Sequence, residues 1–100
     1  MLSEESLSHM CAPRVLHRGR SIAAGGRSVY DRRVRYDCES TIVNAVVASQ
    51  TSSTEGYRVM VELNEGADFV EDYSCTCPAA FQYDGMCKHA VALALDYAAR

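Results

Sequence analysis

Two stretches of the sequence carry the hydrophobic spacing of an α-helix. The first is Arg14–Ala24, where Pro13 suits a helix start and the pair Gly25-Gly26 predicts the end. The second begins at Lys88, and its apolar residues recur at spacings of three, four and seven: Val91, Ala94, Leu95 and Ala98. This second helix is apolar almost all round, so we expect it either to be buried by a sheet or to continue into further residues.

Four stretches between these helices have the alternation or the β-branched content of strands. They are SVYDRRVRYD from Ser28, TIVNAVVAS from Thr41, YRVMVEL from Tyr57 and ADFVEDYSCTC from Ala67. The Asn-Glu-Gly turn signal at 64–66 predicts a hairpin between the last two. This order of elements predicts an α+β fold, with an N-terminal helix, a small antiparallel sheet of three to four strands, a cysteine-rich loop and a C-terminal helix.

The chain is short enough to form a single domain. We expect residues 1–13 to be loose, because they are polar and lack periodicity, and residues 14–100 to form the domain. One hundred residues bury only a modest core, so a metal ion would be a useful staple. With 48% hydrophobic and 23% charged residues, the composition is that of an ordinary globular protein.

Nothing in the sequence predicts a membrane span or export. No apolar run approaches the roughly 20 residues that a span needs, and the N-terminal MLSEESLSHMCAPR lacks the apolar centre of a secretory signal. We therefore expect a reducing cytoplasm, where clustered cysteines hold metal more often than they form disulfides.

The net charge of −3 is unevenly distributed. The segment 14–35 holds seven arginines and a single acid, Asp31, whereas ten acids follow from Asp37 onward. Such a basic segment is either a solvated surface or a footprint for nucleic acid or an acidic partner. The candidate nucleic-acid contacts are Arg18, Arg20, Arg27, Arg32, Arg33 and Arg35.

The stretch CTCPAAFQYDGMCKH, from Cys75 to His89, concentrates three thiols and one imidazole. Cys75 and Cys77 are two positions apart, so an extended backbone points both to the same side. Pro78 favours that extended backbone, in which the two Cα atoms lie near the upper limit of about 6.8 Å for a disulfide. The pair is therefore typical of two metal ligands.

Cys87 and His89 are also two positions apart, but at the start of the second predicted helix. Within a helix they would be separated by about 200° around the axis and could not share a metal. They can converge if Cys87 precedes the first turn and His89 lies in it. The helix N-terminus and Lys88 would then stabilise a thiolate, and the turn signal at 84–85 lets the chain reverse between the two pairs.

Three thiolates and one imidazole form the closed tetrahedral set that structural zinc prefers over calcium or magnesium. Four protein ligands leave no open position for catalysis. The sequence also lacks a phosphate loop, a glycine-rich nucleotide fingerprint and a Ser-His-Asp arrangement. We therefore predict one structural zinc ion, no enzymatic activity in this chain and no small-molecule substrate.

The pattern Cys-x-Cys, nine residues, Cys-x-His resembles the SWIM zinc finger. The segments RGRSIAAGGRSV, YRVMVEL, YSCTCPAAF and MCKHAVALAL extend the resemblance over roughly residues 14–99. It implies that the zinc ligands are Cys75, Cys77, Cys87 and His89. SWIM domains are modules of larger proteins and are generally thought to bind DNA or proteins. This chain resembles the N-terminal region of a bacterial SWI/SNF-type helicase, whose ATPase would lie outside it.

Two functions remain open on this reading. In the first, the domain binds DNA for a helicase, and its arginines contact phosphates. In the second, it binds a protein partner, or another part of its parent chain, through the apolar final helix and the loop that carries Phe81 and Tyr83. Aromatic residues in that loop either pack over the metal site or stack on bases.

Three further residues could take part in chemistry. We expect Cys11 to be an exposed bystander in the loose segment and Cys38 to be a small buried apolar residue, because the predicted tetrahedron is already full. His17 lies among arginines and is either a surface imidazole or a phosphate contact.

Overall fold

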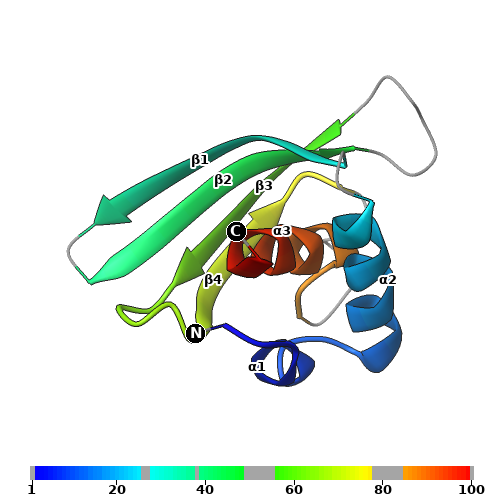
Figure 1. The fold of residues 1–100 in the computed structure, drawn as a ribbon, viewed down its shortest axis with the longest axis horizontal. Coiled ribbons are helices and arrows are strands. Elements are labelled where there is room, and N and C mark those ends of the chain that lie inside the picture. Colours follow the sequence, from blue (N-terminus) through cyan, green and yellow to red (C-terminus); the bar gives the residue numbers. More distant parts are fainter. Residues whose placement is uncertain (1, 26–27, 38, 49–55, 78–84, 100) are drawn as a thin grey trace.

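The computed structural model describes residues 2–25, 28–37, 39–48, 56–77 and 85–99 (Figure 1). The helices and strands follow in the order α1 (Glu4–Ser8), α2 (Pro13–Ala24), β1 (Val29–Asp37), β2 (Ser40–Ala48), β3 (Gly56–Leu63), β4 (Val70–Cys75) and α3 (Lys88–Ala99). The α+β class is confirmed, and the predicted strands form one antiparallel sheet of four, in the order β1-β2-β3-β4.

The inner face of the sheet supports α3. Strand alternation places buried side chains on this face, among them Val43 and Val47 of β2 and Val61 and Leu63 of β3. In Figure 1, all three helices lie on this side of the sheet, and no helix of the described residues covers the outer face. The expectation that the sheet buries the apolar final helix is confirmed, since the α3 residues 89–94 are all buried.

The helices α2 and α3 approach each other closely at Gly19. A Cβ atom built there would lie 2.6 Å from the Cβ atom of Val91 and 3.0 Å from the carbonyl oxygen of Lys88. A side chain at position 19 would therefore hold the helices apart. The absence of a Cβ atom lets α2 lie directly on the first turns of α3.

A β-bulge interrupts β1 between Tyr30 and Arg33. Asp31 lies in the left-handed region at φ 54°, which aspartate tolerates better than most residues. The bulge precedes Arg32, whose guanidinium Nη1 atom lies 3.3 Å from both the carboxylate Oδ2 and the carbonyl oxygen of Asp96 in α3. This contact connects an edge strand to the end of α3.

The N-terminal segment differs from the expected loose tail. Ser3 caps α1 by accepting a hydrogen bond from the backbone of Ser6, and both Leu2 and Leu7 are buried in the core. The segment also contacts the cysteine-rich region, because the backbone N–H of Met86 donates to the carbonyl of Met10 at 2.9 Å. The sequence did not predict this order, because Leu2 and Leu7 are five positions apart and do not form a helical pattern. Both are nevertheless buried in the folded chain.

Candidate metal centre

The first pair of candidate ligands lies at the end of β4. Cys75 is the last residue of the strand, Thr76 follows it beside β3, and Cys77 lies at a bend. The backbone N–H of Thr76 donates to the carbonyl of Arg58 at 3.2 Å, and the hydroxyl of Thr76 accepts from the backbone N–H of Arg58 at 3.1 Å. Thr76 is exposed while Cys77 is buried, so the predicted two-residue fork is confirmed.

The second pair lies at the start of α3. The helix begins at Lys88, and the backbone N–H of Val91 donates to the carbonyl of Cys87 at 3.1 Å. Cys87 therefore occupies the N-cap position, and His89 lies in the first turn. Both side chains are buried. This is the arrangement that lets two residues with i, i+2 spacing turn toward one point.

The two pairs converge on a common centre. One ligand atom from each of Cys75, Cys77, Cys87 and His89 can be chosen so that all four lie within 4.8 Å of one another. The distance from Cys75 Sγ to His89 Nδ1 is 3.8 Å. A tetrahedron with zinc–sulfur bonds of about 2.3 Å has edges of about 3.8 Å, so the cluster has the dimensions of a zinc site.

The two ring nitrogens of His89 differ in their surroundings, because Nδ1 lies near Cys75 and Nε2 does not have a described partner. Its Nε2 atom is buried and has no hydrogen-bond partner among the described residues, which is a costly state unless an ion or water is bound nearby. The ring packs against Tyr57, with 4.8 Å between centroids. Strand alternation in YRVMVEL does not reveal this contact of Tyr57 with a candidate metal ligand.

The thiols of Cys75 and Cys87 have shifted acidities. A hydrogen bond from Cys75, with further hydrogen bonds from His89 and the backbone of Ala90, lowers the pKa of Cys87 despite its burial. The hydrogen bond to Cys87 and burial together raise the pKa of Cys75. A thiolate at Cys87 is a soft anionic ligand, and together with the other three donors it forms a site for one structural zinc ion.

Comparison with known families agrees with this geometry. Residues 57–98 match the family model of the SWIM zinc finger, a non-catalytic binding module. The matched region runs from β3 through β4 and the four candidate ligands into α3. No curated protein and no solved structure matches the chain. The resemblance to the SWIM pattern is therefore confirmed for the metal-binding part.

Of the six arginines predicted to contact nucleic acid, the five that the structure describes do not gather on one face. Arg20 pairs with Glu4, with 3.0 Å between Nε and Oε1. Arg32 pairs with Asp96 and lies over the ring of Tyr97, 5.7 Å from its centroid. The remaining described members are exposed: Arg18 is on α2, and Arg33 and Arg35 are on β1. Arg27 lies outside the described residues.

The register of the sheet places the β1 arginines on its outer face. Arg33 pairs with the exposed Asn44 rather than with a core valine, and Arg35 pairs with Ile42. Their side chains therefore point away from the helices. The sheet separates them from Arg18, so the basic segment of the sequence becomes two basic surfaces in the fold.

One other sequence interpretation is wrong, one loses part of its basis, and three residues fall outside the description. Cys11 is half-buried, not exposed: its thiol donates to the carbonyl of Leu7 at 3.4 Å, and burial raises its pKa. The burial of α3 also removes most of the apolar surface proposed for a protein partner. Outside the described residues lie Cys38, Phe81 and Tyr83.

Proposed function

We propose that this chain is a SWIM-type, non-catalytic zinc module that binds DNA. Zinc joins the end of the sheet to the start of α3, and exposed cations on this scaffold contact phosphates. The observation that carries the proposal is that Arg18, Arg33 and Arg35 are exposed and form no ion pair among the described residues. Arg20 and Arg32 already have carboxylate partners, so they contribute less.

The alternative is a protein-binding module. It retains support from α3, where Tyr97 and Ala98 are half-buried and Ala99 is exposed at the helix end. That surface is small compared with the roughly 800 Å² per partner of a standard interface. We therefore favour DNA as the ligand.

The cellular setting is a further proposal. We place the module in a larger SWI/SNF-type helicase, which rests on the sequence resemblance alone, and in the cytoplasm, because zinc thiolates persist best in a reducing compartment. Within the described part of the chain, no helix combines the length and the apolar character needed to cross a membrane.

A titration tests the DNA proposal. Isotope-labelled, zinc-loaded protein would be mixed with single- and double-stranded DNA at two salt concentrations, and the backbone amide shifts followed. We expect salt-sensitive shifts near the exposed arginines, because each phosphate contact contributes about 0.9 to the slope of log affinity against log salt. The absence of any shift at low salt would reject DNA and favour the protein-binding alternative.

A further inference from the structure

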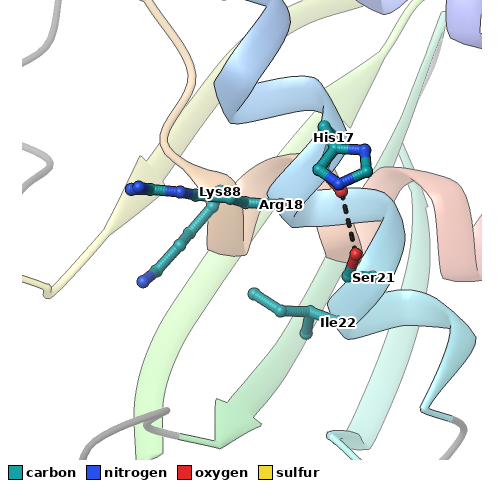
Figure 2. Close-up of a pocket in the computed structure, with 5 residues that line it drawn as sticks. All are labelled: His17, Arg18, Ser21, Ile22 and Lys88. Atoms are coloured by element: carbon teal, nitrogen blue, oxygen red, sulfur yellow. Dashed lines mark hydrogen bonds between the residues drawn. The ribbon is translucent and has the colours of Figure 1, made fainter.

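A pocket of about 420 Å³ opens between α2 and the first turn of α3, close to the metal centre. Its lining comes from His17, Arg18, Ser21 and Ile22 of α2 and from Lys88 of α3. Figure 2 shows that the side chains of Arg18 and Lys88 extend in the same direction, whereas the ring of His17 lies apart from them. Two cations from separate helices therefore line one opening.

The sequence explains why these two cations meet. Gly19 permits the close approach of α2 to Val91 and to the carbonyl of Lys88, and Arg18 precedes that contact point directly. Lys88 lies between the two ligands Cys87 and His89, so a bound zinc ion fixes its backbone on both sides. The helix crossing and the metal site together hold the basic pair in place.

In the described part of the chain, no acid forms an ion pair with the cations that line this pocket. Neither Arg18 nor Lys88 has a carboxylate partner among the described residues. Arg14 is exposed one helical turn before Arg18, and like charges at this spacing repel each other. A zinc ion with three thiolates carries a net charge of about −1. The positive charges of Arg14, Arg18 and Lys88 together exceed it, so the region keeps a net positive charge that attracts an anion.

We propose that this pocket binds a backbone phosphate of DNA between Arg18 and Lys88, an inference that rests on the proposed function. The N-terminus of α3 adds its positive dipole end to the two side chains. Ile22 provides an apolar wall that suits the deoxyribose beside the phosphate. The hydroxyl of Ser21 donates its hydrogen to the carbonyl of His17 at 3.2 Å, so it has no hydrogen left to donate to a phosphate. The two cations are therefore the main binding groups.

The arrangement favours DNA over a phosphorylated peptide. Arg14 and Arg18 are separated by about 6 Å along the helix axis, so the basic row continues beyond the pocket. A single phosphorylated side chain would fill the pocket and leave Arg14 without a partner. A nucleic-acid strand supplies successive phosphates, and each one can meet a cation of the row.

The test uses fluorescence anisotropy with a labelled 20-nucleotide single strand and a 20-base-pair duplex. We expect Arg18→Gln and Lys88→Gln each to weaken binding about tenfold near 0.1 M salt and to lower the salt slope by about 0.9. Arg18→Lys and Lys88→Arg should retain most of the affinity. Arg20→Gln is the matched control, because Arg20 is on the same helix but pairs with Glu4. Zinc content and thermal melting verify the fold of each variant.

The outcomes separate the pocket from the general proposal. If the original protein binds DNA and only Arg33→Gln and Arg35→Gln weaken binding, DNA binding stands and the pocket inference is overturned. If the original protein binds neither strand form at low salt, both proposals fail. Binding of a phosphoserine peptide that depends on Arg18, without DNA binding, would assign the pocket to protein-borne phosphate and would also overturn the inference.

Discussion

The two ends of α3 are attached to opposite edges of the sheet by different chemistry. At its start, Cys87 and His89 converge with two thiols from the end of β4. At its end, Asp96 accepts from Arg32 of β1, the strand at the other edge. The first attachment contains only groups that donate electron pairs to a metal, so it requires a cation from solution. The second brings its own cation and anion, so it is complete as soon as the chain folds.

This difference predicts how the two ends respond to change. Binding of a structural zinc ion contributes on the order of 10 kcal/mol to folding, whereas a hydrogen-bonded ion pair contributes about 1.5–3 kcal/mol. The start of α3 therefore depends on an external ion, and the end depends only on neighbouring side chains. Four substitutions test this comparison, in decreasing order of expected effect.

Cys87→Ser should abolish the zinc site and the cooperative thermal transition. Loss of a binding energy on the order of 10 kcal/mol is comparable with the whole stability of a domain, about 5–15 kcal/mol. Circular dichroism melting and metal analysis would measure the effect. Cys11→Ser is the matched control, since Cys11 is half-buried but is not a member of the cluster. A normal melt with one zinc ion per chain in the Cys87 variant would contradict the assignment.

Gly19→Ala should destabilise the protein by about 1–3 kcal/mol through overpacking. The added methyl group would meet Val91 and push α2 away from the start of α3. Gly25→Ala, at the end of the same helix, is the comparison, because a Cβ atom there would lie 3.3 Å from a carbonyl oxygen, a milder contact than at position 19. Chemical denaturation would measure both variants. Equal stabilities would show that the helices separate at no cost.

Arg32→Gln should lower stability by about 1–2 kcal/mol and leave the zinc content unchanged. The substitution leaves the carboxylate of Asp96, only 6% exposed, without its guanidinium partner. Hydrogen exchange should show weaker protection at the end of α3 than at its start. Arg33→Gln, the exposed neighbour, should have almost no effect. Loss of zinc from the Arg32 variant would mean that the two ends of α3 are not independent.

Arg20→Gln should change stability by less than about 1 kcal/mol. The side chains of Arg20 and Glu4 are 57% and 49% exposed, so solvent screens their ion pair. Urea denaturation at low and high salt would show whether even this small effect is electrostatic. A loss comparable with that of Arg32→Gln would indicate that α1 is held mainly by charge rather than by Leu7.

The metal site could be predicted because its geometry is local. The i, i+2 spacing of Cys75 and Cys77 in a strand, and of Cys87 and His89 at a helix start, restricts where four side chains can point. The strands could also be predicted from the sequence, since the alternation of residues in YRVMVEL marks the buried face directly. Each of these inferences depends on neighbours within a few positions of the chain.

The errors concern contacts between distant parts of the chain. Arg32 and Asp96 are 64 positions apart, and they meet only because a bulge at Asp31 precedes the arginine and the sheet places β1 above the end of α3. The basic segment likewise contains residues of α2 and of β1, which the sheet assigns to different faces. Charge along a sequence therefore did not predict charge on a surface.

The hydrogen bond from Met86 to Met10 joins the first turns of the chain to the region that presents Cys87. Gly85 makes this contact possible, because its φ of +118° and missing side chain bring the two backbones together. The coupling between zinc binding and docking of the N-terminal segment is reciprocal. If bound zinc strengthens the docking of this segment, the docked segment strengthens zinc binding by the same free energy. A partner that pulled α1 away would make the ion easier to extract, and a partner that held α1 in place would make the ion harder to remove.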